Sequence, residues 1–449
     1  MSLREILPRL PVLLAASMLL TAPLRADDQQ QIDRAAAIWQ LLASEHFKEF
    51  VATGDETMKS AFNAQQAEQL WSMLRFQLGK YERVESATVT RVGQYDSVRF
   101  IFRFERGTAT MRLVLNQQGQ LSGLWSDGVA PNVPYQPPDY VDKNAFHEEK
   151  VTVTCGTYEL PGTLSLPNEA GAHPAVVLVH GSGPNDEDET VGANKPFRDL
   201  AWGLASRGIA VLRYEKRTHK YGEDVKPSDI TLDWETIDDA LAAVKSLRQR
   251  PDIDPARVFV LGHSLGGMAA PFIAARDEKL AGIILLAANA RSPLDLVEDQ
   301  TEYLAKLDGG ISDEERQALN ELKQAIAAIR SGQLDHSDKP LLGAPASYWA
   351  SLDKLDPVAE AARLKLPFLI IHGGRDYQVT AADATIWKKR LGERKNVTIK
   401  LYDSLNHLMI AGKGPSSPNE YQQAGHVDET LVRDVAAWIH AESGRAAPE

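Results

Sequence analysis

The feature that most constrains the fold is an alternation of apolar strands and amphipathic helices over residues 145–449. The segment PAVVLVHGSG is a continuous apolar run, which is typical of a strand buried on both faces of a sheet. Similar runs occur in IAVLRYE, RVFVLG, AGIILLAA, LPFLIIHGGRD and NVTIKLYD, and KVTVTCGTYELPGTLSLP has the pattern of an antiparallel hairpin. This order predicts a mainly parallel sheet covered by helices, an α/β fold.

One stretch interrupts the alternation. No strand pattern occurs between about residues 291 and 356, whereas Ser312 and Glu315 form a capping-box pattern that opens a helix. We therefore expect a helical insertion over residues 291–356.

A second domain precedes this one. Residues 27–130 begin with helical spacing and continue as short alternating strands, which predicts a small α+β domain. Residues 131–144 contain four prolines in PNVPYQPPDYVDK, and proline stiffens the chain and removes backbone donors. We interpret this stretch as a linker.

The first 26 residues have the pattern of a signal peptide. Arg4 and Arg9 precede the short apolar run PVLLAASMLL, and Ala26 is a small residue at the expected cleavage site. The sequence thus predicts an exported protein, periplasmic or secreted, with no stable membrane span after cleavage. An uncleaved anchor is the alternative.

Composition limits both the partners of the chain and its covalent links. The net charge of −12 disfavours nucleic acid, because phosphate binding needs a basic face. The single cysteine, Cys155, excludes a disulfide within the chain. Nothing in the sequence fixes an oligomeric state.

The clearest chemical signal is Gly262-His263-Ser264-Leu265-Gly266, between an apolar strand and an alanine-rich helix. A sharp strand-to-helix turn presents the Ser264 hydroxyl above the sheet, and the two glycines leave room for neighbouring backbone. The start of the following helix offers free N–H groups to a developing negative charge. Ser264 is therefore the predicted nucleophile and the Leu265 N–H the first oxyanion donor.

A second oxyanion donor is expected from the loop after an earlier buried strand. His180-Gly181-Ser182-Gly183 supplies such a loop, and the N–H of Ser182 is the candidate, with Gly183 as the alternative. The acidic residues 186–189 follow, and we expect them to form a solvated loop, with metal binding as the alternative.

A serine nucleophile needs a histidine base, and the histidine needs a carboxylate that orients it. Asp376 follows the buried strand in LIIHGGRDYQV, and His407 follows the next strand in IKLYDSLNHLM. The strand ends of an open α/β sheet are where sites form. We predict Asp376 as the orienting acid and His407 as the base, with Asp403 and Asp356 as alternative acids.

At these motifs the sequence resembles the α/β-hydrolase superfamily, and within it exported serine esterases that carry a small α+β domain ahead of the hydrolase domain. The resemblance rests on LGHSLGG, VLVHGSGPNDEDE, AVLRYEKRT, IIHGGRDYQV and NHLM, and covers about residues 145–443. It implies an α/β-hydrolase fold in which the helical insertion is a lid. It also implies a hydrolase of small-molecule acyl esters that needs no metal or other cofactor.

Two alternatives remain open. The same triad would also serve a peptidase or amidase, and Glu298 and Asp299 are then candidates for gripping an amine terminus. The N-terminal domain would otherwise make the protein a ligand-binding module with an inactive hydrolase scaffold.

Overall fold

The computed structural model describes residues 26–131, 135–222, 225–226, 229–307, 309–333, 341–342 and 344–444. The chain divides into two compact units, with the division between residues 132 and 133. The predicted signal peptide lies outside the described residues except for Ala26.

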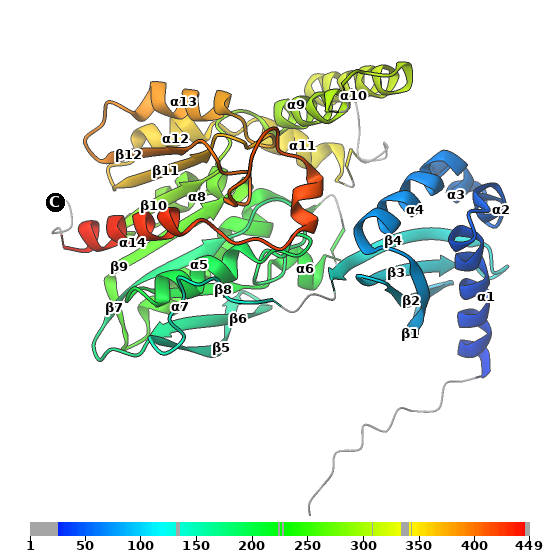
Figure 1. The fold of residues 1–449 in the computed structure, drawn as a ribbon, viewed down its shortest axis with the longest axis horizontal. Helices are drawn as coiled ribbons and strands as arrows, with labels where there is room; N and C mark the ends of the chain where they lie inside the picture. Colours follow the sequence, from blue (N-terminus) through cyan, green and yellow to red (C-terminus); the bar gives the residue numbers. More distant parts are fainter. Residues whose placement is uncertain are drawn as a thin grey trace, which may run out of the picture. The chain divides into compact units, whose positions relative to one another are not determined.

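The first unit packs helices against an antiparallel sheet (Figure 1). The sheet has the order β1-β2-β3-β4. The elements, in chain order, are α1 (Ala26–Ala43), α2 (Phe47–Ala52), α3 (Glu56–Ala61), α4 (Ala64–Leu78), β1 (Tyr81–Val92), β2 (Tyr95–Phe104), β3 (Gly107–Leu115) and β4 (Leu121–Pro131). The predicted α+β arrangement is confirmed.

An aromatic core holds this unit together. Alternate residues of β2 are fully buried on one face of the sheet, among them Phe100, Phe102 and Phe104. Trp39 of α1 stacks on Phe102 with ring centroids 3.8 Å apart, and Trp71 of α4 joins the same cluster. The period-two pattern of β2 thus selects which face the helices cover.

The second unit is built on an eight-stranded sheet of order β12-β11-β10-β9-β7-β8-β6-β5. The strands are β5 (Phe146–Cys155), β6 (Tyr158–Pro167), β7 (His173–Val179), β8 (Ala210–Tyr214), β9 (Ile253–His263), β10 (Gly282–Leu286), β11 (Phe368–Gly373) and β12 (Val397–Tyr402). Pairing is parallel from β12 through to β8, and β5 and β6 are added as an antiparallel hairpin.

Helices and short turns connect these strands. They are α5 (Pro196–Ala205), α6 (Arg217–Tyr221), η2 (Asp233–Ile237), α7 (Asp238–Arg248), α8 (Leu265–Arg276), α9 (Pro293–Lys306), α10 (Asp313–Ser331), α11 (Ala346–Asp353), α12 (Pro357–Arg363), α13 (Ala381–Leu391), η3 (Pro418–Gln422) and α14 (Glu429–Ser443).

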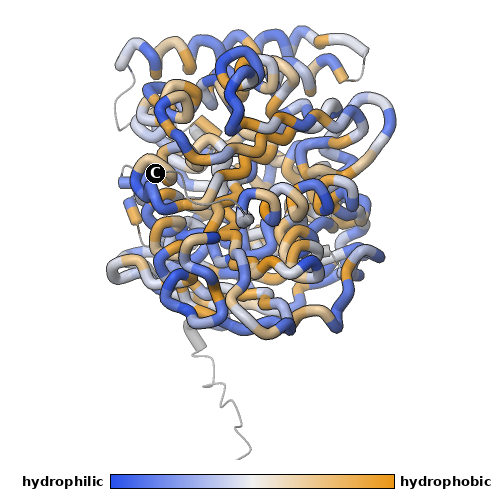
Figure 2. The backbone as a smooth tube through the Cα atoms, turned by 90° about the vertical axis from the view of Figure 1, so that its left-hand side faces the viewer, coloured by the Kyte–Doolittle hydropathy of each residue, from blue (hydrophilic) through white to orange (hydrophobic). Residues whose placement is uncertain are grey.

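The sheet separates two hydrophobic cores. Along β7, Ala175, Val177 and Val179 contribute to one core, whereas Val176 and Leu178 contribute to the other. Helices α7, α8, α12 and α13 cover the first core, and α5 and α14 cover the second. The tube in Figure 2 is accordingly hydrophobic along the interior strands and hydrophilic at many outer loops. Burial on both faces explains the continuous apolar runs in the sequence.

The insertion expected between residues 291 and 356 holds α9, α10 and α11. The capping box of Ser312 and Glu315 is confirmed, with both of its hydrogen bonds present. Helix α11 packs on the first core through Tyr348 and Leu352, while α9 and α10 form a small cluster around Leu294 and Ile326.

Part of the proline-rich segment belongs to the second unit. The Tyr135 hydroxyl donates to Asp199 at 2.5 Å, and the Tyr140 hydroxyl donates to the carbonyl of Val427 at 2.9 Å. Residues 135–144 are therefore anchored on this unit, whereas Pro131 ends β4 of the first unit.

The helix that leads into β9 does not begin as a regular α-helix. Its first turn, η2, is a π-helix, and regular α-helix starts only at Asp238. Single π-turns in helices often occur at functional sites.

Candidate active site

Ser264 lies at the turn between β9 and α8, with φ 53° and ψ −117°. A non-glycine residue in this region is uncommon and strained, so the surrounding structure must hold it. A Cβ on Gly262 would lie 2.1 Å from the carbonyl oxygen of Gly266, and a Cβ on Gly266 would lie 2.2 Å from that of Val179. Both glycines are therefore required by close backbone approach.

Asp376 and His407 meet on loops at the ends of β11 and β12. Nδ1 of His407 lies 2.7 Å from Oδ2 of Asp376 in a hydrogen bond, and both side chains are buried. The other oxygen of Asp376 accepts the amides of Gln378 at 2.8 Å and Val379 at 2.9 Å. These two amides fix the carboxylate with one oxygen facing the imidazole.

The His407 loop packs onto the turn that carries Ser264. The rings of His263 and His407 have centroids 4.7 Å apart, and Nε2 of His263 donates to the carbonyl of His407 at 2.9 Å. Within the described residues, the only hydrogen bond of the His407 side chain is the one to Asp376. In enzymes, the hydrogen bond between a catalytic base and its nucleophile is often long in the free protein and shortens when substrate is bound.

The alternative acids are not brought to His407. The Asp356 carboxylate caps α12 by accepting the amide of Ala359 at 2.8 Å. Asp403 is exposed in the turn after β12.

The loop after β7 lies against Ser264, since a Cβ on Gly181 would be 3.2 Å from the Cβ of Ser264. Among the described residues, the amides of Ser182 and Gly183 have no hydrogen-bond partner. Leu265 is the first residue of α8, where helix N–H groups have no partner within the helix. Unpaired N–H groups therefore flank Ser264 from two segments.

The sequence of the second unit is similar to those of a known protein family. Residues 176–437 match the alpha/beta hydrolase family. The chain belongs to that family. Residues 35–124 match a second family, described as a protein of unknown function (DUF3887).

Relatives of this hydrolase include the esterase EstD of Thermotoga maritima, which is 41% identical over 89% of this chain and 93% of its own length. The polyketide transferase ATR5 of Stachybotrys chlorohalonatus is 28% identical over 30% of this chain and 41% of its own. Among solved structures, Est1E of Butyrivibrio proteoclasticus with ferulic acid has 17% identity and a TM-score of 0.46, covering 66% of this chain and all of that one.

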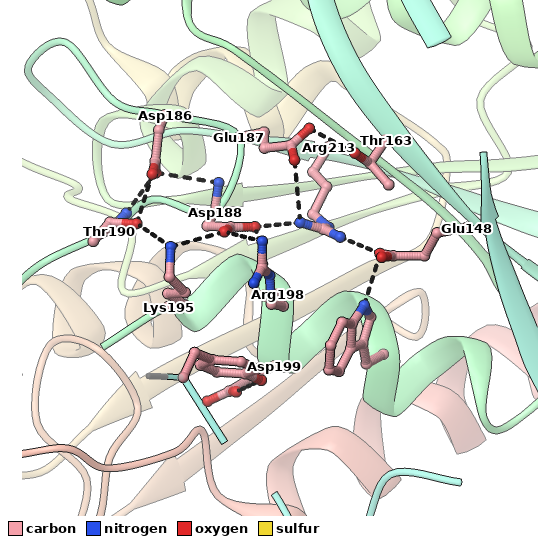
Figure 3. A network of polar contacts seen from close by, with 12 residues as sticks. Glu148, Thr163, Asp186, Glu187, Asp188, Thr190, Lys195, Arg198, Asp199 and Arg213 are labelled. Carbon is pink, nitrogen blue, oxygen red and sulfur yellow. Dashed lines mark hydrogen bonds and ion pairs between the residues drawn. The ribbon is translucent and has the colours of Figure 1, made fainter. Parts of the chain in front are cut away.

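The acidic loop of this hydrolase, residues 186–189, differs from the prediction. Residues 186–189 were expected to be solvated, but Asp188 and Glu189 are only 2% and 3% exposed. Asp188 forms ion pairs with Arg213, with Arg198 at 2.7 Å and with Lys195 at 3.0 Å (Figure 3). Burial raises the pKa of Asp188, but these cations outweigh it and hold the pKa below its usual value.

Glu189 contacts His263, the residue that directly precedes Ser264. Its Oε2 lies 2.9 Å from Nδ1 of His263, an ionic contact outside hydrogen-bond alignment, and its Oε1 accepts the amide of Gly181 at 2.6 Å. Burial lowers the pKa of His263, yet the Glu189 carboxylate outweighs it, so the pKa is raised. The two ring nitrogens of His263 thus face Glu189 and the carbonyl of His407.

Asn406 shapes the loop of the predicted base. Its Oδ1 accepts the amides of Leu408 at 3.0 Å and Ile410 at 3.1 Å, and its Nδ2 donates to Glu420 at 3.1 Å. No role was predicted for Asn406 from the sequence, although it directly precedes His407 in the NHLM motif.

The insertion contacts the loop that carries Asp376. Tyr303 of α9 stacks on Tyr377 with centroids 5.1 Å apart, and the Gln300 side chain donates to the carbonyl of Gln378 at 2.9 Å. These contacts place α9 beside Asp376.

The described residues contain no helix with the length and apolar character needed to cross a bilayer. They also contain no group of three or more His, Cys, Asp or Glu side chains placed to bind a metal.

Proposed function

We propose that this protein is a carboxylic ester hydrolase that works through a covalent acyl-enzyme, with Ser264 as nucleophile, His407 as base and Asp376 as orienting acid. The observation that carries the proposal is the buried Asp376–His407 hydrogen bond beside a serine held at a strained strand-to-helix turn. The 41% identity to the esterase EstD supports esters as the substrate class.

In the first half of the reaction, His407 takes the proton of Ser264 as the hydroxyl oxygen attacks the ester carbonyl. The amides of Leu265 and Ser182 donate to the oxyanion that forms. His407 then gives its proton to the leaving alcohol, and the acyl group remains on the serine.

Water completes the cycle by the same route. His407 takes a proton from water, which attacks the acyl-enzyme, and the released serine recovers its proton. Asp376 stabilises the imidazolium in both halves, because its carboxylate is fixed by two backbone amides and faces Nδ1. Apart from the ester and water, every group in these steps belongs to the chain.

The peptidase alternative has less support. Glu298 and Asp299, the candidates for gripping an amine terminus, form ion pairs with Lys323 at 3.3 Å and Arg291 at 2.7 Å. Rates on p-nitrophenyl acyl esters and on aminoacyl anilides separate the two functions. The proposal expects turnover of the esters to dominate, and faster cleavage of the anilides would contradict it.

We also propose that the protein is exported. The support is the sequence of residues 1–26, with its basic start, apolar run and small residue at position 26. N-terminal sequencing of the protein recovered outside the cytoplasm is expected to start after Ala26. Full-length protein confined to the cytoplasm would contradict export.

A further inference from the structure

Lys216 is a buried lysine that the proposed reaction does not use. It follows β8 in the stretch RYEKR and is 2% exposed. Its Nζ donates to the carbonyl oxygen of Gly181 at 2.8 Å and lies 2.9 Å from Oε2 of Glu235. Burying an ammonium group is costly unless it is paired and hydrogen-bonded, so these contacts fix its position.

The Gly181 carbonyl belongs to the same peptide group as the N–H of Ser182. A trans peptide group is planar, and its C=O and N–H point in opposite directions. A cation bound to the Gly181 oxygen therefore fixes the direction of the Ser182 N–H. It also polarises that N–H, since hydrogen bonds in a chain strengthen one another.

Two other side chains, Glu189 and Asn185, also hold this loop. The Glu189 carboxylate accepts the Gly181 amide at 2.6 Å, and the Asn185 side chain donates to the carbonyls of Gly181 at 3.2 Å and Ser182 at 3.1 Å. The loop is thus held between buried groups of opposite charge, next to Ser264.

Glu235 connects Lys216 to the insertion. It lies on the π-turn η2, and its other oxygen accepts the hydroxyl of Tyr348 on α11. Glu235 and Tyr348 are both buried. A continuous set of polar contacts therefore runs from α11 through Glu235 and Lys216 to the loop beside the nucleophile.

We infer that Lys216 is a positioning residue for the oxyanion hole, acting on the Ser182 N–H through the Gly181 carbonyl. Glu235 pairs with its ammonium group, and Tyr348 of the insertion in turn donates to Glu235. The inference rests on the proposed function, because it requires the Ser182 amide to bind the oxyanion. Removing the charge of Lys216 should therefore weaken binding of the transition state more than it weakens binding of the substrate.

The test is Lys216→Met, which keeps an unbranched side chain as far as the ε position and removes the charged ammonium group. Removing a whole oxyanion donor costs about 10²–10³ in rate, so misorienting one is expected to lower kcat/KM for p-nitrophenyl acetate by about 10–100-fold. Affinity for a trifluoromethyl ketone, which forms a tetrahedral adduct with the serine, should fall by a similar factor. Affinity for the matching methyl ketone, which binds as an unreacted ground-state analogue, should stay within about threefold.

Lys195→Met is the matched control. Lys195 pairs with Asp188 in the same loop region and makes no hydrogen bond to residues 181–182. It is expected to keep the wild-type kcat/KM. Tyr348→Phe removes only the outer contact and should cost less than Lys216→Met.

The inference is overturned if Lys216→Met keeps kcat/KM, or if its affinity for both ketones falls equally. Should the single variant not fold because Glu235 is left unpaired, Lys216→Met/Glu235→Gln removes both charges. Wild-type affinity of that double variant for the trifluoromethyl ketone would also overturn the inference. Activity lost in Ser264→Ala but kept in Lys216→Met leaves the proposed function standing, whereas activity kept in Ser264→Ala removes both.

Discussion

Nδ1 of His407 and Oδ2 of Asp376 are joined by a 2.7 Å hydrogen bond between two buried side chains. Asp376→Asn should lower kcat/KM by about 10⁴, because an amide holds the wrong tautomer of the imidazole and cannot stabilise its charged form. Steady-state kinetics on p-nitrophenyl esters measure the effect. Asp403→Asn, which changes an exposed carboxylate in the neighbouring turn, is the control and should keep full activity.

The nucleophile turn depends on the absence of a side chain at position 266. Gly266→Ala would place a Cβ 2.2 Å from the Val179 carbonyl oxygen, a backbone atom that cannot move freely. We expect a loss of about 3 kcal/mol or more in the free energy of unfolding, together with a loss of activity. Gly310→Ala meets no atom within 4 Å and should unfold like the wild type. Denaturant titration compares the two, and equal stability would contradict the steric account.

Arg213 neutralises the buried Asp188. Arg213→Met leaves that carboxylate without its most buried cation, and breaking a buried pair typically costs about 3–5 kcal/mol of unfolding free energy. Arg257→Met breaks a partly exposed pair with Asp254 and should cost less than about 1 kcal/mol. Thermal unfolding of both variants tests the difference, and similar Tm values would show that burial of the pair is unimportant.

His372 predicts a dependence of stability on pH. Burial lowers its pKa to about 4, and within the described residues neither ring nitrogen has a hydrogen-bond partner. The unfolded chain has the ordinary pKa of about 6.5 and so takes up the proton first as the pH falls. The stability contribution of neutral His372 is therefore complete above about pH 6.5 and is lost as the pH falls towards 4.

Denaturant titration of wild type and His372→Leu at pH 8 and pH 5 measures this contribution. Between these pH values the wild type should lose about 2 kcal/mol more than the variant. Equal losses would mean that His372 is not held neutral in the folded protein.

The strands and the nucleophile turn could be predicted because their signals are local. The continuous apolar runs identify strands buried on both faces, and the period-two pattern of β2 identifies a strand covered on one face. Gly262 and Gly266 flank a serine between a strand and a helix, which only a sharp turn explains. Asp376 and His407 follow the ends of adjacent strands, so the parallel sheet itself brings them together.

The charged groups around the turn could not be predicted because their partners are distant in the sequence. Four consecutive acidic residues at 186–189 look solvated until the fold brings Arg213 and His263 to them. Lys216 lies in AVLRYEKRT, one of the stretches that carry the resemblance, but its role could not be predicted, since Gly181 and Glu235 reach it from other connections of the sheet. The π-turn that positions Glu235 has no counterpart in the helical spacing of the sequence.

The most direct test of the proposed acyl-enzyme mechanism is to quench the protein during turnover of a p-nitrophenyl ester and to measure its mass. We expect an increase equal to one acyl group, located on the peptide that contains Ser264. Ser264→Ala should show no such adduct and a kcat lower by about 10⁶. An acyl group on another residue, or turnover by Ser264→Ala near the wild-type rate, would contradict the account.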